Sequence, residues 1–97
     1  MGKRQFNRRD GNESEICDAL TEYRIPWRLV PPGAGYDLLA STAVGSVWFI
    51  EVKMPGGRMT PNELEFNAWC DKVGLEYIVM RTANDVRDAV KSCNGKH

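Results

Sequence analysis

The run "VWFIEVK" (residues 47–53) constrains the fold more than any other stretch of the chain. It is short, and apolar side chains occupy both of its faces, which is typical of a strand buried in a sheet. Such a strand has to be covered on both sides, so we expect helices on both faces of the sheet. The run ends with an acid and a base, Glu51 and Lys53, which share one face because strand side chains alternate. Taking an unpaired charge out of water is costly, so both groups need partners.

Capping patterns and apolar periodicity predict three helices. Asn12 with Glu15 and Thr60 with Glu63 resemble capping boxes, and Gly74 is placed to end the second helix. Apolar stripes at helical spacing follow in each segment. They are Ile16, Ala19, Leu20 and Tyr23 in the first helix, Phe66, Trp69, Cys70 and Val73 in the second, and Val86, Ala89, Val90 and Cys93 in the third.

Four strands are expected between and around these helices, and the turn at 44–46 is short enough to join two of them as an antiparallel hairpin. The third and fourth strands are separated by a helix, which suggests a parallel crossover. The expected strands cover residues 27–30, 36–42, 47–53 and 76–81. The predicted fold is α/β, with element order αβββαβ(α) and a mixed central sheet flanked by helices.

Length and composition indicate one globular domain. The chain has 97 residues, 42% of them apolar and 27% charged, and its formal net charge is zero. We expect a basic N-terminal arm over 1–11, the domain over 12–93 and a tail over 94–97. No apolar stretch is long enough to span a membrane and no signal segment follows the N-terminus, so a cytoplasmic location is expected.

The inventory of reactive side chains excludes several kinds of site. The only histidine is His97, and the three cysteines lie far apart without metal-type spacing. Histidine catalysis and a Cys/His zinc site are therefore excluded, and the thiols are expected to be reduced. The N-terminal arm is basic without any acid, which suits either a phosphate backbone or a solvated terminus. Its basic residues are Lys3, Arg4, Arg8 and Arg9.

A third charged residue belongs with the acid and base of the central strand. Asp37 begins the neighbouring hairpin strand, and in an antiparallel hairpin the start of one strand lies beside the end of the other. Asp37 is therefore expected next to Glu51 and Lys53. Two close carboxylates repel unless a proton or a cation lies between them, and Mg²⁺ takes such oxygen ligands. The alternative is a Glu–Lys pair at a solvated strand end, which contributes about 0–1 kcal/mol.

The motif "YD" followed by "EVK" resembles the signature of PD-(D/E)XK nucleases. Over about residues 8–90 the chain is similar to the small stand-alone VRR-NUC-type nucleases of bacteriophages, which have a restriction-endonuclease-like fold. The similarity is carried by "GAGYDLLA", "WFIEVK", "MTPNELEFNAWCDKVG" and "EYIVMRTANDVRDAV". The strand motif alone is only moderately specific, whereas its combination with the helix that begins at "TP" and the closing strand and helix is more specific.

The resemblance implies a Mg²⁺- or Mn²⁺-dependent endonuclease that hydrolyses DNA. Its catalytic residues map to Asp37, Glu51 and Lys53, with Asp37, Glu51, the Val52 carbonyl and Glu13 as metal ligands. It also points to branched substrates such as Holliday junctions, to a homodimer and, for a phage-encoded chain, to the host-cell cytoplasm.

Two positions depart from the family pattern. Tyr36 replaces a proline that carries no ligand, and Glu63 replaces a glutamine. Glu63 could act near the metal ligands or simply cap its helix, and Tyr36 could pack or touch substrate. Arg58 follows a Gly-Gly turn and could contact DNA backbone or be solvated. Glu13 lies in the first turn of its helix, where an acid is favoured whatever its function.

Two other functions remain open on the sequence alone. One is a non-catalytic nucleic-acid-binding or assembly module with the same fold. The other is a small structural domain in which these charges form a surface network. Clustered carboxylates favour the enzyme, because a binding module has no physical need for them.

Overall fold

The structure is a computed structural model and describes residues 11–42 and 44–94. The predicted arm residues Lys3, Arg4, Arg8 and Arg9 lie outside this part of the chain. The elements follow the predicted order, and each strand begins and ends within two residues of its expected position. They are α1 (Glu13–Glu22), β1 (Trp27–Leu29), β2 (Leu38–Ser41), β3 (Val47–Val52), α2 (Pro61–Val73), β4 (Glu76–Met80) and α3 (Ala83–Asn94).

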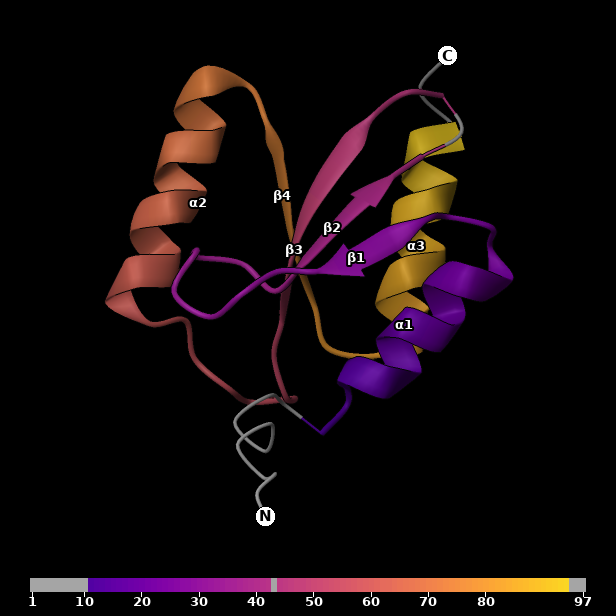
Figure 1. The fold of residues 1–97 in the computed structure, drawn as a ribbon, viewed down its shortest axis with the longest axis horizontal. Helices are drawn as coiled ribbons and strands as arrows, with labels where there is room; N and C mark the ends of the chain where they lie inside the picture. The colour runs from indigo at the N-terminus through magenta and orange to yellow at the C-terminus, as the bar shows by residue number, and fades with distance from the viewer. Residues whose placement is uncertain (1–10, 43, 95–97) are drawn as a thin grey trace.

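The four strands form one mixed sheet in the order β1-β2-β3-β4. Strand β2 runs antiparallel to both β1 and β3, whereas β4 runs parallel to β3 after the crossover through α2. Helix α2 lies on one side of the sheet, and α1 and α3 lie together on the other (Figure 1). The predicted hairpin, the parallel crossover and the cover on both faces are all confirmed.

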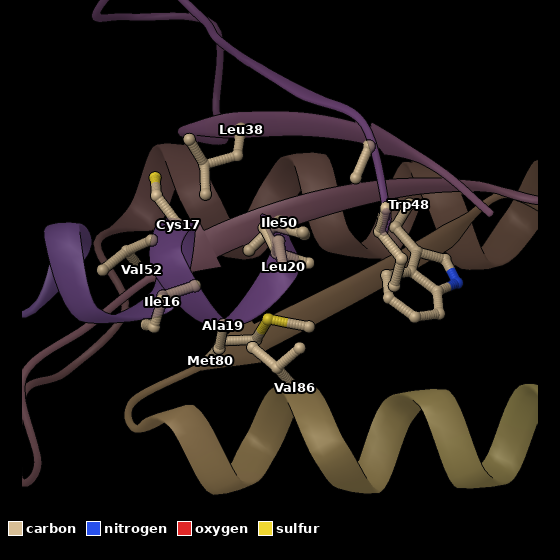
Figure 2. Packing of buried hydrophobic residues seen from close by; sticks show 12 residues of the cluster. Ile16, Cys17, Ala19, Leu20, Leu38, Trp48, Ile50, Val52, Met80 and Val86 are labelled. Carbon is tan, nitrogen blue, oxygen red and sulfur yellow. The ribbon is translucent and has the colours of Figure 1, made fainter. Parts of the chain in front are cut away.

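The main core lies between the sheet and the pair α1 and α3. Trp48 and Ile50 of β3 point into it, and side chains from both helices meet them there (Figure 2). Fully burying a large apolar side chain contributes about 1.5–3 kcal/mol, so this layer supplies most of the packing energy. Its most deeply buried members are Ile16, Leu20, Leu38, Trp48, Ile50, Met80 and Val86.

Helix α2 packs on the opposite face through aromatic rings. The Phe66 ring lies 5.1 Å from that of Tyr36 and 5.9 Å from that of Phe49, measured between centroids. The predicted stripe of this helix is only half right, because Cys70 is buried while Trp69 and Val73 are about half exposed. A helix that lies alone on its face touches the sheet along a narrow line, and the edges of its stripe stay in solvent.

The two predicted capping boxes have different outcomes. At α2 the box is confirmed: the Thr60 hydroxyl accepts from the Glu63 N–H and the Glu63 carboxylate accepts from the Thr60 N–H. At α1 it is wrong, because the Asn12 side chain makes no cap and Glu15 accepts from the Ala83 N–H at the start of α3. Both side chains of the expected α1 box bond to distant parts of the chain instead.

Within the described residues, no helix combines the length and the apolar character that a membrane crossing requires.

Candidate active site

The site is built around the C-terminal end of β3. Glu51 is almost completely buried, with 2% of its surface exposed, although it is a carboxylate. It lies on the same face of β3 as Phe49, beneath α2, and Lys53 follows just beyond the end of the strand. The buried strand therefore carries its acid and base to the point where the sheet ends and α2 begins.

Asp37 is brought to the same place by the β2–β3 hairpin. The backbone N–H of Asp37 donates to Ile50 O at 2.8 Å, and its carboxylate Oδ2 accepts from the Val52 N–H at 2.8 Å. The Asp37 carboxylate thus accepts a β3 N–H just before the first residue of β2. In a strand the N–H and C=O of one residue point to the same side, so the Val52 carbonyl also faces the Asp37 side.

Lys53 lies between two carboxylates of the site. Its Nζ is 2.8 Å from Glu63 Oε1 and 3.7 Å from Glu51 Oε2. Only 13% of the Lys53 side chain and 17% of the Glu63 side chain are exposed, so water screens this pair less than a surface pair. The structure therefore brings together Asp37, Glu51, Lys53 and Glu63.

Burial and like charge shape the electrostatics of the cluster. Burial, together with the nearby Glu63 and Asp37 carboxylates, raises the pKa of Glu51 from 4.5 to about 9, and burial is the largest cause. Burial also opposes ionisation of Glu63, but hydrogen bonds from Lys53 and the Thr60 backbone outweigh it and lower its pKa. The pKa of Tyr77 is raised by its burial and by the same carboxylates. The site holds excess negative potential that a cation would relieve.

The donor set suits a hard divalent cation. Asp37 and Glu51 offer carboxylate oxygens, and the Val52 carbonyl faces the same side. Mg²⁺ is commonly held by one or two carboxylates, with waters and substrate phosphates completing its shell. Among the described residues, no three or more His, Cys, Asp or Glu side chains are arranged to hold a metal by themselves. The residues thus fit a Mg²⁺ that is only partly enclosed by protein.

Hydrogen bonds from distant residues hold the end of β3 in place. The Asn12 Nδ2 donates to Lys53 O at 2.9 Å and to Arg81 O at 2.6 Å, so it clasps the ends of β3 and β4. The Arg81 guanidinium donates to Met54 O and Gly57 O, both at 2.9 Å, and supports the loop after β3. Sequence reasoning missed both roles, because a side chain that bonds to remote backbone carbonyls leaves no local pattern.

The remaining predicted residues lie around this centre. Glu13 opens α1 next to Asn12, and its role as a metal ligand stays a prediction. Tyr36 is half-buried and packs its ring against Phe49 and Phe66. Arg58 is exposed in the loop between β3 and α2. Its contact with DNA also stays a prediction.

A separate hollow of about 450 Å³ lies at the other end of the hairpin. It is lined by Pro26, Trp27, Arg28, Leu39, Ala40, Ser41 and Val47, and none of the predicted site residues is among them. Its lining is mostly apolar and carries no carboxylate. The chemistry of the chain is therefore concentrated at the Asp37–Glu51 end of the sheet.

Comparison with known proteins places the fold. The sequence matches no protein family and no curated protein. A solved structure described as "VRR_NUC domain" superposes with a TM-score of 0.69 over 84% of this chain and 97% of that one, with 21% identical residues. At this identity the likeness concerns the fold. The chain therefore has the same fold as this VRR_NUC domain structure.

Proposed function

We propose that the protein is a Mg²⁺- or Mn²⁺-dependent endonuclease that hydrolyses phosphodiester bonds in DNA. One observation supports this most strongly. The Glu51 carboxylate is buried beside Asp37 and Glu63, with the Lys53 ammonium against it, at the end of a central strand. Burying this acid is costly in a purely structural role, whereas a metal-assisted hydrolase needs these groups together.

The metal would be held by Asp37, Glu51 and the Val52 carbonyl, with Glu13 as a further candidate. When bound, it would supply Lewis-acid stabilisation of the charge that develops on the phosphate. Lys53 would place its ammonium beside the phosphate and orient the attacking water. The water oxygen forms a bond to phosphorus as the bond to the leaving sugar oxygen breaks. The attacking water would release its proton to solvent, and the leaving oxygen would take up a proton from solvent.

Substrate and assembly follow from the size of the domain. A single small domain of zero net charge offers little surface for DNA, so the basic arm and Arg58 would supply backbone contacts. A homodimer would provide two active sites and suit branched DNA such as a Holliday junction. Sedimentation equilibrium should give twice the mass of the chain, and the mass of one chain would contradict the dimer.

We propose that the protein acts in the cytoplasm, which is that of the host cell if a phage encodes the chain.

The experiment that tests the function is a cleavage assay of the wild type, Lys53→Ala and Lys72→Ala. Lys72 is an exposed lysine near the end of α2 and serves as the matched control. Substrates are linear duplex, single-stranded, flap and four-way-junction DNA, each with Mg²⁺, Mn²⁺ or EDTA.

We expect metal-dependent cleavage by the wild type and Lys72→Ala and a loss of at least about a hundredfold in Lys53→Ala. The ranking of substrates would identify the preferred DNA structure. Absence of cleavage by folded wild type on every substrate would contradict the enzyme and favour the binding module.

A further inference from the structure

Glu63 joins the start of α2 to the lysine of the candidate active site. Its Oε1 lies 2.8 Å from Lys53 Nζ and accepts the Thr60 N–H, also at 2.8 Å. The Glu63 N–H in turn donates to the Thr60 hydroxyl at 3.2 Å. Both the backbone and the carboxylate of Glu63 are therefore fixed by the cap of the helix. A side chain held in this way can hold a neighbour in place.

The arrangement decides which group Lys53 meets in the DNA-free protein. Its ammonium is closer to Glu63, at 2.8 Å, than to Glu51, at 3.7 Å. Since both members of the Lys53–Glu63 pair are largely shielded from water, their attraction is only weakly screened. A phosphate that enters the site has to share this ammonium with Glu63, and it also meets the negative charge of the carboxylate.

We propose that Glu63 is a positioning residue that holds Lys53 for the reaction and, through its charge, weakens the hold of the site on DNA phosphate. The inference rests on the proposed nuclease function. Glutamine in the same place would still offer an oxygen to Lys53 and to Thr60, but without charge. The Glu63 carboxylate therefore lowers the affinity for DNA phosphate and, in the same contact, fixes the position of the Lys53 ammonium.

The test compares Glu63→Gln with Glu65→Gln. Glu65 is an exposed carboxylate on the same helix, so its substitution removes the same charge away from the site. For Glu63→Gln we expect KM to fall about fivefold because repulsion of phosphate is reduced, and kcat to fall about tenfold because Lys53 is held less firmly. Glu65→Gln should leave both constants close to those of the wild type.

A second readout does not depend on catalysis. Fluorescence anisotropy with labelled DNA in EDTA should show Glu63→Gln binding about fivefold more tightly than the wild type and Glu65→Gln. Thr60→Ala separates the helix cap from the lysine contact, because it removes the hydroxyl acceptor and keeps the carboxylate. Circular dichroism would confirm that all variants are folded.

The outcomes distinguish this inference from the proposed function. If the wild type cleaves DNA and Glu63→Gln matches Glu65→Gln in KM, kcat and DNA affinity, Glu63 is only a cap and the inference falls alone. If Thr60→Ala reproduces the opposed changes in KM and kcat, they belong to the cap and the inference also falls. If the wild type neither cleaves nor binds any DNA, the proposed function fails and the inference fails with it.

Discussion

At the scale of single residues, Glu51 combines two properties that rarely occur together. Its carboxylate is almost fully buried, and two further carboxylates lie close to it. A buried acid in such surroundings takes either a proton or a cation, because the bare anion is costly. The proton and the divalent cation therefore compete for one position, and pH acts on the protein through this residue.

The first prediction concerns stability and pH in the absence of metal. The pKa of Glu51 is 4.5 without perturbation and is raised to about 9 in the folded protein. The folded state then binds the proton more tightly than the unfolded state. The contribution of protonated Glu51 to the free energy of unfolding is complete below the pKa of the unfolded state. It is lost as the pH rises toward the pKa of the folded state. Urea unfolding in EDTA should give midpoints that fall between about pH 5 and about pH 9.

Glu51→Gln is the control for this pH effect, because glutamine is neutral throughout the range. Its midpoints should vary less with pH than those of the wild type. Equal slopes for the two proteins would show that other groups cause the dependence.

At the scale of elements, the loop before β2 depends on Gly35. This residue has φ +95°, and an added Cβ would lie 2.8 Å from the Cβ of Phe66 on α2. We predict that Gly35→Ala lowers the free energy of unfolding by about 2–4 kcal/mol, through backbone strain and displacement of α2. It should also lower cleavage, since Glu63 moves with the helix.

Gly33→Ala is a matched control for this substitution. Gly33 has φ +94° but nothing within 4 Å of an added Cβ, so it shares the strain without the clash. Chemical denaturation of both variants separates the two causes. Equal losses of stability would show that contact between α2 and the loop contributes nothing.

The Asn12 clasp yields a second prediction at this scale. Asn12→Ala removes the donor shared by Lys53 O and Arg81 O and leaves two partly buried carbonyls without it. We expect a loss of about 1–3 kcal/mol in unfolding free energy and a lower kcat, because the end of β3 is held less firmly. Asn62→Ala, at an exposed position of α2, should change neither. A stable and fully active Asn12→Ala would contradict the clasp.

Local sequence patterns predicted the elements well where the pattern and the burial coincide. Ile16 and Leu20 of α1 and Val86 of α3 are buried as their spacing predicts, and the Thr60–Glu63 cap forms. Trp69 does not follow the prediction, because it lies at the edge of the buried stripe of α2 and half of its surface stays exposed. The hydrogen bonds of Asn12 and Glu15 were not predictable either, because their partners lie far along the chain and residue spacing does not indicate such contacts.

The candidate site was predictable to a similar extent. The hairpin geometry placed Asp37 beside Glu51 and Lys53, because a short turn determines which residues lie opposite one another. The contact between Lys53 and Glu63 was not predictable, since it depends on how closely α2 approaches the end of β3. That approach is set by the packing of Phe66 against Gly35 and the aromatic rings, which no local motif encodes.

At the scale of the whole molecule, zero net charge means that affinity for DNA has to come from local basic groups. We predict that replacing Lys3, Arg4, Arg8 and Arg9 with alanine weakens DNA binding. The slope of log affinity against log salt should become shallower by about one for each phosphate that the variant no longer neutralises. Arg87→Ala, exposed on α3, is the control and should keep the slope. An unchanged slope in the variant with all four alanine substitutions would show that the arm does not contact the DNA backbone.

The most direct test of the account is the rate of DNA cleavage as a function of Mg²⁺ concentration for the wild type, Glu51→Gln and Glu76→Gln. Glu76 is an exposed acid at the start of β4 and serves as the control. We predict saturable, EDTA-sensitive cleavage by the wild type and Glu76→Gln, and a rate at least about a hundredfold lower for Glu51→Gln at every Mg²⁺ concentration. Cleavage that persists in EDTA, or a Glu51→Gln variant as fast as the wild type, would contradict a metal-dependent site at the end of β3.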